Sequence, residues 1–374
     1  MPSFRPFTME RWQSTYEYRV AHNLSESGVE PLTVRELLAL ADSSIDELAL
    51  GYGQSNGSDP LRAAIAALYQ GAGEAGVVVC NGSAEANFIA CWRLVEPGDT
   101  VAVVVPTYMQ THGLARNFGA RVVEVPLHEE LAWQPDPDEV RRLLTGNIRL
   151  LVITNPNNPT GATLDQRSRA ALIAAAERTG AWILADEVYT GAELSGTDTP
   201  SYFGECPRVI ATGSLSKAYG LPGLRIGWAV TTAEMAADLW SRKDYTTIAP
   251  GALTDRLACL ALSDVVRPRI TARTRDIIRR GLTVLHPYLA RWGCSWRDPE
   301  AGAICYARYP WDINSSAFAE RLRSEQSVLV VPGDQFAMDG YVRFGIGLHD
   351  EPHQQALARI DRLVHNLGAP AAVS

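Results

Sequence analysis

Short apolar runs alternate with longer amphipathic stretches through the middle of the chain. The runs are rich in β-branched residues and lie at 77–80, 101–105, 122–125, 150–154, 182–185 and 209–212. Most of them are too apolar for a strand with one face in water, so helices are expected to cover both faces. Strands that alternate with helices in this way predict an α/β fold with a mostly parallel sheet flanked by helices.

Capping residues and apolar stripes indicate several of the helices. Asp59 and Pro60 open one helix as its cap and its first residue, and Gly180 ends another that begins near Asp165. The segment 251–289 is largely helical in composition, and we expect it to link the sheet to a C-terminal part with its arginine-rich face in solvent. The last helix carries a stripe of Leu357, Ile360, Val364 and Leu367.

Length and composition are those of a globular protein with a substantial core. The chain has 374 residues, of which 46% are hydrophobic and 20% charged, enough for one large domain with a smaller companion or for two domains. A formal net charge of -8 argues against nucleic acid as a partner, because a polyanion is repelled.

Cysteine usage and the absence of long apolar runs bear on the cellular location. The six cysteines form no CxxC pair and no zinc spacing, which indicates thiols in a reducing compartment and neither disulfides nor a metal site. No apolar run approaches the roughly 20 residues that cross a bilayer, and the first residues lack the apolar core of a signal peptide. We therefore expect a cytoplasmic protein with no membrane span.

The most informative stretch for chemistry surrounds Lys217, which ends the segment TGSLSK at 212–217 and precedes Arg225 by eight positions. A lysine among small hydroxyl residues can form a Schiff base with an aldehyde. Ser214, Ser216 and Arg225 supply donors for a dianionic phosphate. Pyridoxal 5'-phosphate carries both groups. The same short motif also fits an ordinary surface loop.

A second motif follows the strand at 77–80. Gly82 permits a tight turn, and a helix that begins at Ser83 and Ala84 presents unpaired N–H groups to an anion. This arrangement predicts a phosphate-binding cup. A serine-capped turn between a strand and a helix is the plainer alternative.

Two further motifs follow the strands at 150–154 and 182–185. In the first, prolines restrict the loop around Asn158, whose amide can then donate to a phenolate oxygen. In the second, Asp186 can pair with a protonated pyridine nitrogen, and Tyr189 can give a second donor to the phenolate. A plain turn and a capping aspartate with a packed tyrosine are the structural alternatives.

Two more side chains have candidate roles toward a ring and a carboxylate. Tyr108 lies just beyond the strand at 101–105, where an aromatic ring can stack on a planar cofactor, although core packing is a commoner role. Arg343 is the one charged residue in the apolar run 341–345, and its fork geometry suits an α-carboxylate. An internal salt bridge to a carboxylate side chain is the alternative.

The motifs and their order along the chain resemble those of the fold-type I pyridoxal-phosphate enzymes, specifically the class I/II aminotransferase family. The resemblance covers nearly the whole chain. The resemblance implies that Lys217 is the Schiff-base lysine, that Asp186 contacts the ring nitrogen, and that Asn158 and Tyr189 contact the phenolate. It implies that Tyr108 stacks on the ring. The phosphate ligands would be Gly82, Ser83, Ala84, Ser214, Ser216 and Arg225, and the substrate ligands Gly28, Asn158 and Arg343.

The resemblance also implies a quaternary structure and a division into domains. Tyr52, in a Tyr-x4-Gly pattern, would reach the phosphate across the interface of a homodimer. A large cofactor-binding domain would span 46–288, and 1–45 with 289–374 would form a smaller α+β domain. The segment 302–306, GAICY, departs from the Gly-Gly-aromatic pattern that is frequent in the family, which affects pocket assignments there.

For activity, the resemblance favours transamination of an α-amino acid through external aldimine and quinonoid intermediates, because DEVY at 186–189 is the usual aminotransferase form. β- or γ-elimination, replacement or cyclisation is a competitor. The chain is similar to capreomycidine synthases, family members that cyclise a hydroxylated arginine, at 27–29, 215–225, 244–246 and 328–333. The third hypothesis is a non-catalytic amino-acid sensor, which the complete set of lysine, aspartate and arginine disfavours.

Overall fold

A seven-stranded sheet forms the centre of the computed structural model, which describes residues 4–367. The strand order is β2-β8-β7-β6-β5-β3-β4. Only β8 is antiparallel to its neighbours, and all other pairs are parallel. The strands are β2 (Val77–Cys80), β3 (Thr100–Val105), β4 (Arg121–Pro126), β5 (Leu150–Thr154), β6 (Trp182–Asp186), β7 (Val209–Ser214) and β8 (Gly227–Val230).

All six strands predicted from the apolar runs are present, and their ends differ from the prediction by two residues at most. The strands β2, β5 and β7 are buried along their whole length, as their composition indicates, whereas the edge strand β4 is partly exposed. The sequence did not single out β8, which is short and follows the Arg225 motif directly.

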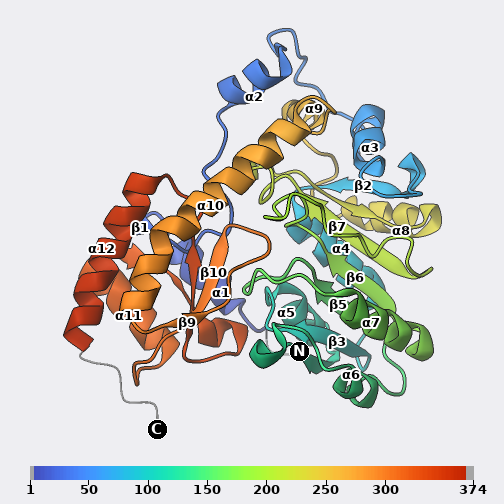
Figure 1. The fold of residues 1–374 in the computed structure, drawn as a ribbon. Helices are drawn as coiled ribbons and strands as arrows, with labels where there is room; N and C mark the ends of the chain where they lie inside the picture. Colours follow the sequence, from blue (N-terminus) through green and yellow to red (C-terminus); the bar gives the residue numbers. More distant parts are fainter. Residues whose placement is uncertain (1–3, 368–374) are drawn as a thin grey trace.

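Helices cover both faces of this sheet (Figure 1). Side chains of α4 (Ser83–Leu94), α5 (Gln110–Asn117) and α8 (Ala233–Lys243) pack with the strands in one buried cluster. A second cluster on the opposite face contains α6 (Pro137–Leu143) and α7 (Gln166–Thr179). The mostly parallel α/β architecture is therefore confirmed.

Two predicted helix boundaries can be compared with the structure. Asp165 caps α7 through a hydrogen bond from the Ser168 N–H, and Gly180 ends it with a φ of 72°. The predicted cap of α3 (Asp59–Ala66) is wrong by one residue. The Ser58 side chain accepts from the Leu61 N–H, because a hydroxyl at the residue before the first turn reaches this donor.

Segments from the N-terminal and C-terminal parts of the chain pair beside the large sheet. Strand β1 (His22–Asn23) pairs in parallel with β11 (Val328–Leu329). A four-stranded antiparallel sheet has the order β12-β13-β10-β9, with strands β12 (Val331–Pro332), β13 (Tyr341–Gly345), β10 (Ile304–Arg308) and β9 (Ser295–Trp296). The nearby helices are α1 (Thr8–Tyr16), α11 (Ser315–Gln326) and α12 (Asp350–Leu367). The exact domain division at 45/46 and 288/289 stays a prediction.

Helix α10 (Arg267–Arg291) runs from the region of α2 (Val34–Ala41) and α9 (Ala252–Ala261) to the small sheet (Figure 1). The predicted link between the two parts of the chain is present. The prediction that its arginines face solvent holds for Arg269, Arg279 and Arg280, which are exposed, and is wrong for Arg267 and Arg275. Arg267 and Arg275 both pair with Asp198 of the 190–200 loop, because residues about two turns apart lie on the same face of α10.

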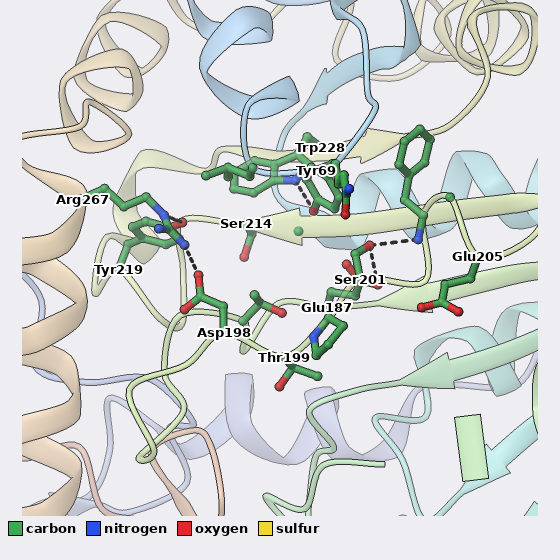
Figure 2. Close-up of a pocket in the computed structure, with 17 residues that line it drawn as sticks. Tyr69, Glu187, Asp198, Thr199, Ser201, Glu205, Ser214, Tyr219, Trp228 and Arg267 are labelled. Atoms are coloured by element: carbon green, nitrogen blue, oxygen red, sulfur yellow. Dashed lines mark hydrogen bonds and ion pairs between the residues drawn. The ribbon is translucent and has the colours of Figure 1, made fainter. Parts of the chain in front are cut away.

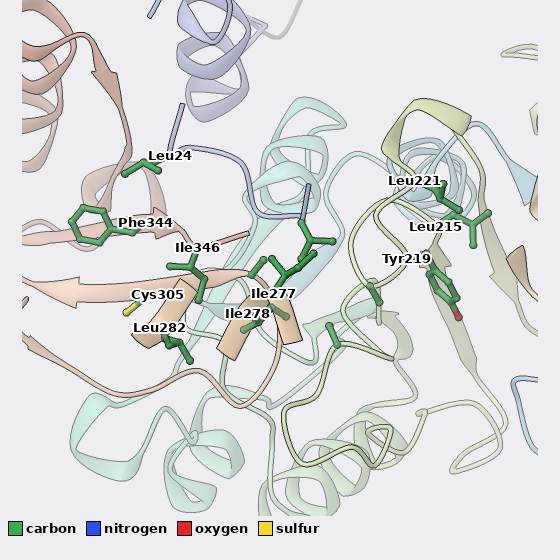
Figure 3. Close-up of a cluster of buried hydrophobic side chains, with 14 of the residues drawn as sticks. Leu24, Leu215, Tyr219, Leu221, Ile277, Ile278, Leu282, Cys305, Phe344 and Ile346 are labelled. Atoms are coloured by element: carbon green, nitrogen blue, oxygen red, sulfur yellow. The ribbon is translucent and has the colours of Figure 1, made fainter. Parts of the chain in front are cut away.

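The largest buried cluster joins α10 to both parts of the chain (Figure 3). Ile277, Ile278 and Leu282 of α10 belong to the same cluster as Phe344 of β13 and Leu215 beyond β7. The backbone approaches closely at Gly281, where a Cβ atom would collide with the carbonyl oxygen of Ile346. This core fixes β13 relative to the loop that carries Lys217.

No helix within residues 4–367 combines the length and hydrophobicity needed to cross a membrane. All six cysteines are free thiols, and Cys80, Cys91 and Cys305 are buried. Burial raises the pKa of the Cys91 thiol to about 12, so it is a neutral core residue at physiological pH.

Candidate active site

A cavity of about 330 Å³ lies where β5, β6 and β7 end. The last residues of these strands, Thr154, Asp186 and Ser214, all line it, which agrees with the general position of ligand sites at the carboxyl ends of parallel strands. The predicted site residues that line it are Ser83, Ala84, Tyr108, Asn158, Asp186, Tyr189, Ser214, Ser216, Lys217, Arg225 and Arg343.

A larger cavity of about 760 Å³ lies nearby and shares Ser214, but its charged groups already have partners (Figure 2). Arg267 pairs with Asp198 and donates to the Tyr219 hydroxyl. Burial raises the pKa of Glu187 to about 7, although its carboxylate accepts hydrogen bonds from Ser201 and from the Tyr202 N–H. Because this cavity contains no lysine, the smaller one is the candidate active site.

Lys217 lies in the loop after β7, with its side chain about one quarter exposed. Its Nζ is 4.0 Å from Glu26 Oε2. The chain passes close to it at Gly28, where a Cβ atom would be 3.3 Å from the Ser216 carbonyl oxygen and 3.8 Å from Lys217 Cδ. Gly28 therefore lies against the lysine but does not line the cavity, and its predicted role as a substrate ligand stays a prediction.

The predicted phosphate-binding residues form a cradle at the start of α4. Gly82 has a φ of 80° and a Cβ atom there would collide with the Arg225 guanidinium. Arg225 is exposed, and its Nη1 is 3.5 Å from Ser216 Oγ. The first N–H groups of α4, at Ser83 and Ala84, have no acceptor within the helix. These donors and the guanidinium match the chemistry of a phosphate group.

Asp186 is buried at the end of β6 and has an elevated pKa. Burial raises the pKa of this carboxyl to about 6, against the opposing effect of hydrogen bonds from Asn87 Nδ2 at 2.9 Å and from the Val188 N–H. Thr212 in turn donates to Asn87 Oδ1 at 2.9 Å, which directs the Asn87 amide group toward the aspartate. The sequence analysis missed Asn87, whose only signal is a polar residue on the apolar face of α4.

Asn158 and Tyr189 both keep a hydrogen-bond donor for a ligand. The Tyr189 side chain is 1% exposed, yet its hydroxyl has no partner among the described residues. Asn158 Oδ1 accepts from Arg343 Nη1 at 2.8 Å, so its remaining polar group is the NH₂ donor. Gly302 packs against the Tyr189 ring, where a Cβ atom would be 2.8 Å from Cδ1. The first residue of the GAICY segment is therefore a glycine for a steric reason, because a side chain there would collide with the Tyr189 ring.

Arg343 is buried on β13, with 1% of its surface exposed. It donates to Asn158 Oδ1 and to the Ser25 carbonyl oxygen, and its Nε has no partner within residues 4–367. No carboxylate in this part of the chain forms a salt bridge with it, so the alternative of an internal salt bridge is wrong. Burial lowers its pKa, because the charged form loses hydration. Such a cation is suited to an anionic ligand.

The remaining predicted residues lie in two different situations. Tyr108 lines the cavity beyond β3, and its hydroxyl donates to Glu10 Oε1 at 2.6 Å. Tyr52 is 97% exposed and does not line the cavity. Sequence reasoning missed the acidic residues that line it from the N-terminal region, Glu10, Glu17 and Glu26, because no local motif indicates that this region returns to the sheet.

The residues fit pyridoxal 5'-phosphate: an amine, a phosphate cradle, a buried carboxylate and a buried phenol that has no partner within residues 4–367 share one cavity. The family model of aminotransferase class I and II matches residues 23–360. Capreomycidine synthase of Streptomyces vinaceus is 32% identical over 94% of this chain and 92% of its own length. For arginine–pyruvate transaminase of Pseudomonas aeruginosa the identity is 29%, over 86% and 85%.

A solved structure shows the same fold. The crystal structure of a PLP-dependent aminotransferase from Streptococcus suis matches with a TM-score of 0.91 and 31% identity, over 99% of this chain and all of the other. The chain is therefore an enzyme of the class I and II aminotransferase family, with the fold of type I pyridoxal-phosphate enzymes and pyridoxal 5'-phosphate as its cofactor.

Proposed function

We propose that the protein transfers the amino group of an α-amino acid to a keto acid. One observation carries this proposal: the Lys217 amine shares a cavity with Arg343, a buried cation that has no anionic partner within residues 4–367. An α-amino acid brings a carboxylate, which matches the buried Arg343 cation, and an amine, which can take the place of the Lys217 amine at the cofactor aldehyde. The similarity to two transaminases of full length supports the same reaction.

In this proposal, the chain's own residues hold the cofactor at each of its polar groups. Asp186 pairs with the ring nitrogen, while the free donors of Asn158 and Tyr189 bind the phenolate oxygen. Tyr108 stacks on the ring. The phosphate is bound by Gly82, Ser83, Ala84, Ser214, Ser216 and Arg225, and by Tyr52 of a second copy. The protein would then be a homodimer, and we propose that it works in the cytoplasm.

When bound, the cofactor supplies an electron sink for the pair released at the substrate α-carbon. Lys217 removes the α-proton, since its amine becomes free when the substrate amine replaces it. For transamination, Lys217 returns that proton to a neighbouring carbon. Arg343 binds the α-carboxylate, with Asn158 fixing one of its nitrogens, and Gly28 lets the chain pass close to the reacting amine.

A second candidate function is elimination or replacement followed by ring closure. The observation in its favour is the match to capreomycidine synthase, which covers 94% of this chain. The same cavity residues serve both reactions up to the removal of the α-proton. The two reactions then differ in where that proton and the stored electrons go. A non-catalytic sensor is disfavoured, because Lys217, Asp186 and Arg343 are all present in the cavity.

The test adds a panel of amino acids to the cofactor-loaded protein without a keto acid and follows absorbance and products. Stoichiometric conversion to pyridoxamine phosphate and one keto acid supports transamination. Continued turnover with loss of water, ammonia or another leaving group supports the second candidate. Lys217→Ala is expected to abolish both and to leave no covalently bound cofactor after borohydride reduction. Reducible covalent cofactor in this variant would contradict the role of Lys217.

A further inference from the structure

Three glutamates line the candidate active site and have no role toward the cofactor. Glu10 lies on α1, Glu17 caps the C-terminal end of α1, and Glu26 follows β1. The basic side chains of this cavity are Lys217, Arg225 and Arg343. Under the proposed function these three cations serve the cofactor aldehyde, the phosphate and the α-carboxylate. The glutamates are therefore acidic groups in excess of what the proposed chemistry uses.

The three carboxylates form one negative region beside the reacting amine. Glu26 Oε2 lies 4.0 Å from Lys217 Nζ, and Glu10 Oε1 accepts from the Tyr108 hydroxyl. Glu17 forms no ion pair within residues 4–367. Partial burial raises the pKa of Glu17, and the carboxylates of Glu26 and Glu10 raise it further through their repulsion of a charged Glu17. A cation placed among them would relieve this repulsion.

Two buried donors in the same cavity independently indicate that a ligand enters it. The Tyr189 hydroxyl and Arg343 Nε have no partner among the described residues, and each side chain is 1% exposed. An unpaired buried donor is costly, so both are accounted for by a ligand that the cavity receives. The glutamates are the acidic residues that line this cavity other than Asp186, so they are the anionic groups available to the side chain of an amino acid bound between Arg343 and Lys217.

We propose, in an inference that rests on the proposed function, that Glu10, Glu17 and Glu26 select a substrate whose side chain ends in a cation. A guanidinium or an ammonium on an aliphatic chain forms charge-assisted hydrogen bonds with these carboxylates. A second carboxylate on the substrate would instead be repelled, so the same residues exclude dicarboxylic amino acids. This assigns the specificity of the site to the N-terminal segment and leaves the sheet to hold the cofactor.

The experiment titrates the cofactor-loaded enzyme with L-arginine and L-citrulline and derives dissociation constants from the change in cofactor absorbance. The two compounds have nearly the same shape, and only arginine is cationic at its end. Arginine is expected to bind at least about tenfold more tightly. Glu17→Gln, with Glu10→Gln as a second variant, is expected to remove most of that preference, chiefly by weakening the binding of arginine. Glu177→Gln, an exposed position on α7, is the control.

Each outcome has a separate meaning. Equal binding of arginine and citrulline overturns the inference, and so does a preference that both variants retain in full. In either case, an absorbance change with any amino acid leaves the proposed function standing. If no amino acid alters the cofactor spectrum, the proposed function fails, and the inference fails with it. A preference for arginine that falls in the two variants and not in Glu177→Gln supports the inference.

Discussion

Arg343 is a buried cation whose neighbours are neutral oxygen atoms. It donates to the Asn158 amide oxygen and to the Ser25 carbonyl oxygen, with 1% of its surface exposed. A buried charge without a counter-ion contributes little to folding and is expensive to keep. At the scale of the residue, its presence is therefore better explained by ligand binding than by stability.

Arg343→Met tests this explanation, because it removes the charge and keeps much of the volume. We expect the free energy of unfolding of the cofactor-free protein to rise or to change by less than about 1 kcal/mol in urea titrations. The affinity of the loaded enzyme for amino acids should fall about 100-fold. Arg321→Met, at an exposed ion pair on α11, should alter neither quantity. A loss of about 3–5 kcal/mol would indicate a structural role for Arg343.

Asp186 should make the cofactor-free protein less stable as the pH rises. Its folded-state pKa is about 6, above the ordinary value of 3.8, so the native state retains a proton that the unfolded chain releases. The loss of stability caused by ionising Asp186 is absent at a pH below its pKa in the unfolded chain. It is complete at a pH above its pKa in the folded protein. Between pH 4.5 and pH 7.5, the wild type should lose about 2 kcal/mol more than Asp186→Asn does. Parallel stability profiles in urea titrations would contradict the elevated pKa.

At the scale of the element, α10 shows how tertiary contact reverses a local preference. Replacing a helix-interior glycine by alanine normally stabilises a protein by roughly 0.5–1 kcal/mol. In α10, however, a Cβ atom on Gly281 would collide with the Ile346 carbonyl oxygen, so the small sheet and the helix could not keep their spacing. In α5, Gly113 has open space around its Cβ position.

Gly281→Ala and Gly113→Ala form a matched pair. We expect Gly281→Ala to destabilise the protein by about 1–3 kcal/mol, because the backbone must shift. Gly113→Ala should stabilise it by about 0.5–1 kcal/mol through the ordinary helix preference. Thermal or urea unfolding of both variants measures the difference. Equal effects of the two substitutions would mean that α10 can move away from β13 at little cost.

At the scale of the whole molecule, Tyr52 distinguishes a site built from one chain from a site built from two. Its side chain is 97% exposed and does not line the cavity of its own chain. The predicted contact with the phosphate therefore requires a second copy. Hybrid dimers of Tyr52→Ala and Lys217→Ala distinguish the two arrangements. If Tyr52 acts on the partner's site, each hybrid dimer has one intact site and one site that carries both substitutions.

Mixing the two variants by refolding or co-expression is expected to restore activity. With random pairing, half of the dimers are hybrids with one working site in two, so the mixture should reach about a quarter of wild-type activity. If Tyr52 acts in its own chain, every site in a hybrid carries one change and the mixture gives only the mean of the two parents. A monomer in sedimentation experiments would contradict the homodimer itself.

Local sequence determined the sheet and most of the site at its edge. Apolar runs predicted six of the seven strands in the large sheet, because burial on both faces demands continuous hydrophobic residues. Asp186 and Ser214 were predicted as cofactor ligands from the motifs at the ends of such strands, and they line one cavity because parallel strands end at the same edge of the sheet. A glycine also gave the end of α7 at Gly180, whereas the start of α3 was placed one residue too late, because its cap is Ser58.

Only the tertiary structure decided which distant segments complete that site and what each polar group already binds. The chain from Glu10 to Gly28 reaches Lys217 because β1 pairs with β11, a contact between residues about 300 positions apart that no local pattern encodes. Asn87 supports Asp186, and Arg343 has no anionic partner among the described residues, because partners are set by packing in three dimensions. The sequence by itself therefore determined a cofactor site at the ends of parallel strands, and folding decided what faces the substrate, since long-range contacts leave no local periodic signal.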